Sequence, residues 1–412
     1  MHGDRDEHFY GDDPPEEGQN LIKIESGRNI IIDGVKIVDG SKGGMNINSL
    51  GFTFNSDYKP SHNIVVKNCV FENNRRMGMS ITDGFDIIIE NNKFINSGQP
   101  SSYVDGGVVG YALNIEGVRT RDQNTGQLVY YERPHNIIVR GNYERGSRVG
   151  GITISSGDNV LVENNDMENK IVYSATSDSE IRNNKLISSS KSSESPAIIA
   201  GGRGESVFNN EISGNVIEGY GVGIVAYYDD VRVLNNIINE CGTGIQLKEI
   251  TNSTISNNKI NSTVSISRGI MAHLTSANNV SVSNNEINVV VDAFYLVELN
   301  RGSGQDNFKL NVSENIINST NGKITFSNIN GLNFESNVIG SGIQMVNVSR
   351  IDLQSNKVVN TKGNGISLRE SNVNVVIAGN DILIPLNYEC IKNTSTSQTG
   401  VNIDTSNICT NN

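Results

Sequence analysis

The sequence predicts an all-β fold, a single-stranded right-handed parallel β-helix of about 14 coils. Three observations predict it. A short β-branched run followed by one or two Asn residues recurs along the chain, a second run that usually begins with Gly lies between its copies, and no stretch has the apolar spacing of a helix. Gly is abundant (42 residues) and Pro is scarce (7), as expected for many short strands joined by tight turns.

The Asn motif is clearest at residues 64–71 and 87–94, which read IVVKNCVF and IIIENNKF. Most copies follow the previous one by 19 to 31 residues, and one step, from Asn92 to Asn142, spans 50. Asn tolerates the left-handed backbone of a tight bend, and its side chain can bond to the Asn one coil above. We therefore predict that the aligned residues hold turns; they are Asn92, Asn142, Asn165, Asn184, Asn215, Asn236, Asn258, Asn285, Asn315, Asn337, Asn356 and Asn380.

The Gly-opened runs supply a second strand in each coil. They include Gly78–Ile81, Gly151–Ile154, Gly244–Leu247, Gly269–Ala272, Gly342–Met345 and Gly365–Leu368. Two or three short strands in a period of about 22 residues are typical of a β-solenoid. A leucine-rich repeat would need regular Leu, and a propeller blade would need about twice the length.

Charge and hydropathy narrow the function classes. The formal net charge of −12 and the pI near 5.0 argue against nucleic acid as the main ligand, because a phosphate backbone demands a basic surface. No apolar run approaches the ~20 residues that span a bilayer. Met1 is followed at once by polar residues, so no classical signal peptide is predicted. The chain is then made in the cytoplasm, exported by another route or cut from a longer polypeptide, and we expect an extracellular protein or a virion tail component.

The four cysteines do not form a disulfide framework at this length. Cys390 and Cys409 are candidates for one disulfide near the C-terminus, and Cys69 and Cys241 are expected to be buried small hydrophobic residues. The acidic stretch GDRDEH at residues 3–8 could chelate a divalent metal such as Ca²⁺, but it has no defined ligand spacing. No cofactor and no metal ligand are therefore predicted.

Breaks in the repeat indicate where a site lies. We assign residues 1–20 to an N-terminal extension or cap, 21–390 to the β-helix and 391–412 to a C-terminal tail or cap, with loop excursions at 50–62 and 98–135. Insertions in a solenoid often lie on one binding face. The excursion at 50–62 and the part of the second at 117–134 both leave the stack after equivalent strands of their coils, so we expect them to project from one side and to wall a groove. The coil between them, with Arg75, Arg76 and Asp83, should form its floor.

The contents of this region suit a glycan. Tyr side chains stack on sugar rings, Arg offers forked donors to carboxylates and hydroxyls, and carboxyl groups serve in acid–base catalysis. His135 could be a general base or could simply hold a turn, since it directly precedes an Asn-Ile strand start. The catalytic candidates are Asp83, Glu116, Arg75, Arg76 and His135. The substrate-binding candidates are Tyr58, Tyr103, Tyr111, Arg119, Arg121, Asp122, Tyr130, Tyr131, Glu132 and Arg148.

Three segments carry a resemblance to a family: GDRDEH at 3–8, ENNRRMGMSI at 72–81 and ALNIEG at 112–117. Together they resemble the right-handed parallel β-helix proteins of the pectate-lyase-like superfamily, particularly phage tail and tailspike proteins and bacterial relatives. Such relatives often have Asp where this chain has Asn114, so only Glu116 matches their acidic pair. The resemblance implies a polysaccharide partner, with lyases, glycoside hydrolases and epimerases among the members.

Two hypotheses follow. The first is an enzyme that cleaves a surface, capsular or uronate-containing polysaccharide. A lyase would use Arg75 or Arg76 on a uronate carboxylate with Tyr111 or His135 as base. A hydrolase would use Asp83 and Glu116, with the carboxyl groups ~5–5.5 Å apart for retention or ~6.5–9.5 Å for inversion. The rival hypothesis is a glycan-binding or structural phage tail fibre without catalysis. A homotrimer is considered as the assembly.

Overall fold

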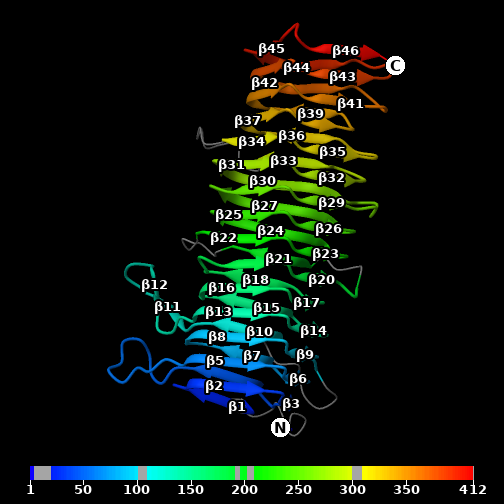
Figure 1. Ribbon diagram of the computed structural model, residues 1–412. Coiled ribbons are helices and arrows are strands. Elements are labelled where there is room, and N and C mark those ends of the chain that lie inside the picture. The colour runs from blue at the N-terminus through cyan, green and yellow to red at the C-terminus, as the bar shows by residue number, and fades with distance from the viewer. Residues whose placement is uncertain (4–19, 101–108, 191–194, 202–207, 299–308, 412) are drawn as a thin grey trace. The chain divides into compact units, whose positions relative to one another are not determined.

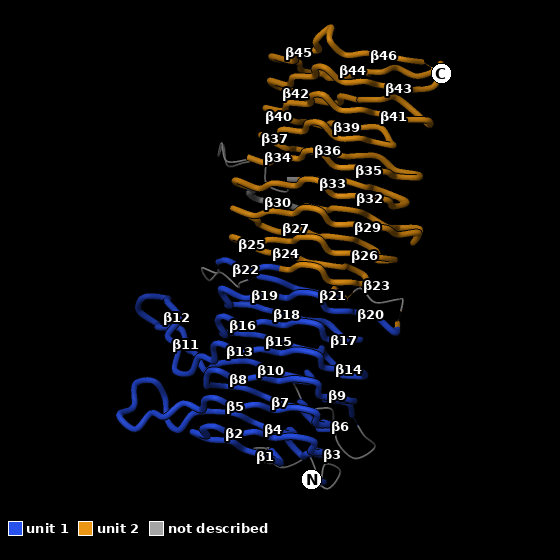
Figure 2. Tube along the Cα trace, viewed as in Figure 1, with its two compact units in different colours: residues 1–189, 197–211 blue, residues 190–196, 212–412 orange. Residues whose placement is uncertain are grey.

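The computed structural model describes residues 1–3, 20–100, 109–190, 195–201, 208–298 and 309–411. Tyr103 and most of the acidic stretch near the N-terminus lie outside the described residues. The chain divides into two compact units, which are shown in different colours in Figure 2. Unit 1 contains residues 1–189 and 197–211, and unit 2 contains residues 190–196 and 212–412.

In unit 1 successive strands join three parallel sheets in turn, called sheets I, II and III (Figure 1). Sheet I contains β1 (Ile22–Glu25), β4 (Gly43–Asn48), β7 (Met77–Ile81), β10 (Tyr111–Glu116), β15 (Gly150–Ser155), β18 (Ile171–Ser174) and β21 (Pro196–Ala200). Sheet II contains β2 (Arg28–Asp33), β5 (His62–Lys67), β8 (Phe85–Glu90), β13 (His135–Arg140), β16 (Asp158–Glu163) and β19 (Glu180–Arg182). Sheet III contains β3 (Lys36–Val38), β6 (Val70–Glu72), β9 (Lys93–Ile95), β14 (Tyr143–Arg145), β17 (Asp166–Met167) and β20 (Lys185–Ile187). An antiparallel hairpin, β11 (Arg119–Arg121) with β12 (Leu128–Tyr130), interrupts the series.

Unit 2 repeats this order. Boundaries between the units fall within β21, whose first residue Pro196 belongs to unit 2, and within β22 (Asn210–Ser213). Its sheet I contains β24 (Val222–Asp229), β27 (Thr243–Thr251), β30 (Arg268–Asn278), β33 (Phe294–Glu298), β36 (Ile324–Ser327), β39 (Ile343–Val346), the first part of β42 (Ile366–Ala378) and β44 (Ile391–Thr399). Its sheet II contains β25 (Val231–Leu234), β28 (Thr254–Ser256), β31 (Val280–Ser283), β34 (Leu310–Ser313), β37 (Asn330–Glu335), β40 (Ser349–Gln354), the last part of β42 and β45 (Asn402–Ile403). Its sheet III contains β23 (Val216–Glu218), β26 (Ile237–Asn239), β29 (Lys259–Asn261), β32 (Glu286–Val289), β35 (Ile316–Ser319), β38 (Val338–Ile339), β41 (Lys357–Val359), β43 (Asp381–Ile384) and β46 (Ile408–Asn411).

The predicted fold class, an all-β parallel β-helix, is confirmed. Each of the two units consists of coils of short parallel strands, and the described residues contain no helix that could cross a membrane. Residues 391–411, which the sequence assigned to a tail or cap, contain β44, β45 and β46. These three strands pair in parallel with β42 and β43.

The core of each unit is a stack of equivalent apolar side chains from successive coils. In sheet I of unit 1 the register aligns Ile47 with Ile81, Ile115 and Ile154, and all four are fully buried. The strand period of two directs these residues inward, and the parallel register repeats the placement in every coil. Burial of this apolar surface is the main stabilising contribution to such a solenoid.

The two asparagines of each pair have different roles in the turn. The first Asn of a pair adopts the left-handed backbone, as at Asn91 (φ 54°) and Asn257 (φ 56°). The second points inward and is buried. Asn92, for example, donates its backbone N–H to the Oδ1 of Asn142 at 2.9 Å and its Nδ2 to the carbonyl of Val66 at 3.0 Å. The turn-holding role predicted for the ladder is therefore confirmed.

The cysteines lie where the pattern placed them. Cys69 occupies the ladder position of its coil, is fully buried, and donates its backbone N–H to the Oδ1 of Asn92 at 2.9 Å. Cys241 is buried as well. Cys390, which directly precedes β44, and Cys409, which lies in β46, form a disulfide.

Candidate functional site

In unit 1, both excursions begin after a strand of sheet I and end at a strand of sheet II. One connects β4 to β5, and the other, with its hairpin, connects β10 to β13. Figure 1 shows both on the same side of unit 1, as the sequence predicted. The excursions contact each other. Thr53 donates its N–H to the carbonyl of Tyr131 at 3.0 Å, and the Phe54 ring packs edge-on against the Tyr131 ring, with 5.2 Å between the ring centroids.

The contact between the excursions covers Asp83, which follows β7 in the coil between them. Asp83 is only 1% exposed. Its Oδ2 accepts a hydrogen bond from the Tyr58 hydroxyl at 2.7 Å, and its Oδ1 accepts the N–H groups of Gly84 and Arg133 at 2.9 and 3.2 Å. The expected open groove with Asp83 on its floor is therefore wrong. Asp83 instead fastens both excursions to the coil beneath them.

Glu132 is the second buried carboxyl group in this cluster. It is 6% exposed, and its Oε1 accepts a bond from the Ser49 hydroxyl at 3.4 Å. Burial, reinforced by the nearby charge of Asp83, raises the pKa of Glu132 to about 7. Burial and the hydrogen bond to Asp83 also raise the pKa of Tyr58. The cluster of Ser49, Tyr58, Asp83 and Glu132, named the carboxyl clasp, joins segments far apart in sequence.

The two arginines lie at the opposite end of β7 from Asp83. Arg75 and Arg76 precede β7, whereas Asp83 follows it, and five strand residues at about 3.3 Å each separate the two ends. Arg75 is 1% exposed and donates to the carbonyl of Ser41 at 3.3 Å. The expectation that both arginines face outward on a flat sheet is wrong for Arg75, because its guanidinium is enclosed by the turn. Arg76 is half-buried.

A row of polar side chains crosses the outer face of sheet I, and is called the polar row. The parallel register aligns Asn46, Ser80, Asn114 and Thr153 in four successive coils. Ser80 donates its hydroxyl to Asn46 Oδ1 at 2.7 Å, and the Oδ1 of Asn114 is buried without a hydrogen-bond partner among the described residues. Apolar Val172 occupies the same position in the next coil, so the polar row ends there.

Aromatic and charged groups flank the polar row. Tyr111 begins β10, and a Cβ at Gly150 would collide with its ring, so this glycine lets the ring lie against the next coil. Burial raises the pKa of Tyr111, with a smaller contribution from the charge of Glu116. Glu116 is exposed at the opposite end of β10 and accepts a bond from Asn114 Nδ2 at 3.3 Å. Arg148 is exposed near the start of β15.

The remaining candidates are dispersed over the second excursion and sheet II. Arg119 donates to the Ser155 hydroxyl at 3.1 Å, which ties the hairpin to the edge of sheet I. Arg121 ends β11, and Asp122 begins the hairpin turn, where backbone N–H groups lower the pKa of Asp122. The Tyr130 ring packs against a neighbouring guanidinium in the same excursion.

His135 lies on the outer face of sheet II, away from the polar row. Its ring stacks on Phe85 at 5.2 Å, and Phe85 stacks on His62 at 5.0 Å. The stack follows the register of β5, β8 and β13. His135 is thus the first residue of β13, and both roles that the sequence allowed for it stay predictions.

Sequence reasoning missed the polar row as a unit. Its members share one local signal: each is a polar residue between two apolar residues near the end of a sheet I strand, as in Met79-Ser80-Ile81 and Leu113-Asn114-Ile115. Period-two alternation directs such a residue outward. Among the described residues, no group of three or more His, Cys, Asp or Glu side chains could hold a metal ion.

Comparison with known proteins agrees with this fold. A family model described as "Right handed beta helix region" matches residues 7–116 and 129–287. The uncharacterized protein YclG of Bacillus subtilis (strain 168) is 30% identical over 274 residues, which cover 65% of this chain and 45% of YclG. The SPbeta prophage-derived uncharacterized protein YorA of the same strain is 23% identical over 249 residues, which cover 57% of this chain and 40% of YorA. The chain thus spans less than half the length of the curated relatives it matches.

One solved structure shares the fold over most of the chain. A mutant tailspike protein of E. coli bacteriophage HK620, in complex with a pentasaccharide, superposes with a TM-score of 0.53 and 11% sequence identity. The match covers 92% of this chain and 69% of the tailspike chain. At this identity the likeness shows the fold alone.

Proposed function

Since the chain belongs to the right-handed parallel β-helix family, we propose that it is a carbohydrate-active member that binds a polysaccharide on the outer face of sheet I of unit 1. The observation that carries this proposal is the polar row, which places an amide or hydroxyl group in each of four successive coils, with Asn46 and Thr153 half-buried and Ser80 and Asn114 only 7% and 6% exposed. Coils repeat about every 4.8 Å, so an extended glycan lying along the stack would meet an equivalent hydrogen-bonding group at each step.

The groups beside the polar row suit a sugar chain as well. The half-buried Tyr111 ring lies against Gly150 and has an apolar surface with a polar tip. Arg148 and Glu116 are exposed at opposite ends of the strands, where they would contact charged or hydroxyl substituents. The phage tailspike that shares this fold was solved with a pentasaccharide, which makes a saccharide the first ligand class to test.

Binding has better support than cleavage. Hydrolysis by Asp83 and Glu116 would need both carboxyl groups to reach a glycan, but Asp83 is covered by the excursions and accepts three hydrogen bonds. Burial raises the pKa of Tyr111, so the phenolate that a lyase reaction would need as base is harder to form. Arg75 is enclosed. The proposal includes an extracellular or virion location and requires no cofactor.

The experiment is a binding panel of bacterial capsular polysaccharides and uronans, read by biolayer interferometry on the full chain. Reducing ends and absorbance of an unsaturated product are recorded in parallel to detect cleavage. Asn114→Leu removes an amide from the polar row and should weaken binding about three- to tenfold, the equivalent of one net hydrogen bond. Asn333→Leu, on the outer face of sheet II in unit 2, is the matched control and should leave binding unchanged. Unaltered binding by Asn114→Leu would place the site elsewhere.

A further inference from the structure

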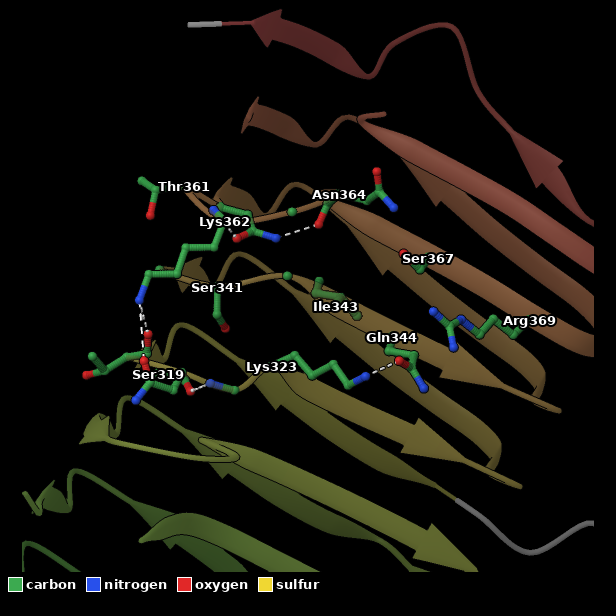
Figure 3. Close-up of a pocket in the computed structure, with 17 residues that line it drawn as sticks. Ser319, Lys323, Ser341, Ile343, Gln344, Thr361, Lys362, Asn364, Ser367 and Arg369 are labelled. Carbon is green, nitrogen blue, oxygen red and sulfur yellow. Dashed lines mark hydrogen bonds between the residues drawn. The ribbon is translucent and has the colours of Figure 1, made fainter. Parts of the chain in front are cut away.

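Unit 2 has a hollow of about 270 Å³ on its outer surface, over three successive coils (Figure 3). It lies where sheet III leads into sheet I, beside the connections 320–323, 340–342 and 360–365. The middle connection is shorter than the other two. It therefore projects less from the stack, and the recess between its neighbours is the hollow.

The lining of the hollow is basic. It includes Lys323, Lys362 and Arg369, and it includes no Asp or Glu. This composition is opposite in sign to the whole chain, whose formal net charge is −12. Three cations gathered without a lining carboxylate repel one another, so an anion placed among them is stabilised.

The two lysines are held at the hollow by neutral oxygens. Lys362 Nζ donates to the carbonyl of Thr320 at 2.8 Å, and Figure 3 shows its side chain extending past Ser341 toward the preceding coils. Lys323 Nζ donates to Gln344 Oε1. These neutral partners position the amines without neutralising their charge.

One carboxylate lies close to Lys323 outside the lining. Asp292 acts on the charge of Lys323 and also forms an ion pair with Arg268, with 3.7 Å between Arg268 Nε and Asp292 Oδ2. Burial and the charge of Arg369 lower the pKa of Lys323, and Asp292 only partly opposes them. Asp292 therefore offsets part of the positive charge at the hollow.

Two lining groups have no partner among the described residues. The Ser341 hydroxyl is buried without a hydrogen bond, although Ser341 lies between Lys323 and Lys362 in Figure 3. The guanidinium of Arg369 is exposed and has no ion pair or side-chain hydrogen bond in the part of the chain that the structure describes. A buried hydroxyl without a partner costs about 1–3 kcal/mol, and a ligand oxygen would remove that cost.

We propose that this hollow binds the carboxylate of an acidic saccharide. The Arg369 fork and the two ammonium groups suit a carboxylate. The uncharged lining, with Ser341, Gln344 and Asn364, suits the hydroxyl groups of a sugar ring, whereas a small free anion would leave most of these groups unused. This second site is in unit 2, so it does not depend on the polar row in unit 1.

The test measures binding of three oligouronates, of galacturonate, mannuronate and guluronate, to the full chain by isothermal titration calorimetry. A neutral malto-oligosaccharide of the same length and inorganic sulfate are the comparison ligands. Arg369→Gln should weaken oligouronate binding at least tenfold, and Ser341→Ala should weaken it severalfold. The control is Lys357→Gln, an exposed lysine on sheet III of the same unit and outside the lining, which should bind as the unmodified chain does.

Saturable oligouronate binding that is lost in Arg369→Gln and is absent for the malto-oligosaccharide supports the proposal. Three results would overturn it: no saturable binding of any oligouronate, equal affinity for the neutral sugar, or sulfate binding as tight as that of the best oligouronate. Asn114→Leu in unit 1 should not change the affinity of this hollow. Failure of one site is thereby distinguished from failure of the other.

Discussion

The asparagine ladder predicts a specific cost for removing one amide. Asn258 is 1% exposed, and its Oδ1 accepts both the backbone N–H and the Nδ2 of Asn236 at 3.0 Å. Its Nδ2 donates to the carbonyls of Val233 and Ser256 and to Asn285 Oδ1. Asn258→Ala removes all of these bonds while leaving the backbone in place.

The consequences differ among the partners. Asn236 Nδ2 keeps the carbonyl of Ile212 at 2.9 Å, and Asn285 Oδ1 keeps the backbone N–H of residue 258 at 3.0 Å. The backbone N–H of Asn236 loses its acceptor and remains buried, which costs about 1–3 kcal/mol. The carbonyls of Val233 and Ser256 also lose the donor that Asn258 supplied. Taking these losses together, we expect the free energy of unfolding to fall by about 2–4 kcal/mol.

The assay is guanidinium unfolding followed by far-UV circular dichroism, combined with hydrogen exchange at the amide of Asn236. That amide should exchange faster in Asn258→Ala, because its acceptor has been removed. Asn257→Gly is the matched control. Residue 257 has φ 56°, which glycine adopts freely, so its unfolding free energy should change by no more than about 1 kcal/mol. Unchanged unfolding and unchanged exchange in Asn258→Ala would refute the ladder as a source of stability.

Two further predictions concern buried groups in unit 1. The folded protein raises the pKa of Glu132 from its ordinary value of 4.5 to about 7, so between these values the folded state binds more protons than the unfolded state and stability falls as pH rises. In a pH series of urea unfolding curves, Glu132→Gln should flatten this fall of stability with pH. The control Glu116→Gln, at an exposed position, should retain the fall. An equal slope in both variants would contradict this explanation. Cys69 is fully buried, so a thiol reagent should label it only after denaturant is added, and rapid labelling of the folded protein would show that the register of its coil is wrong.

The sequence predicted only part of the candidate site in unit 1. The sequence identified the two excursions and their common side, because an insertion after equivalent strands must leave a solenoid at equivalent corners. It placed Arg75 and Asp83 in one open groove, however, whereas the structure buries both at opposite ends of β7. Burial of a charged side chain depends on what covers it, and residues from distant excursions cover Asp83.

The sequence by itself determined the coil. Alternating Ile and Val, Gly-opened strands and paired asparagines are local signals, because the direction of each side chain and the left-handed bend at Asn91 follow from residues within a few positions. Only the tertiary structure decided the sites. The carboxyl clasp joins Ser49 to Glu132 across 83 residues, and the basic hollow arises because one connection is shorter than its neighbours in the stack. Contacts of this range depend on how loops of unequal length pack on stacked coils, which no local pattern encodes.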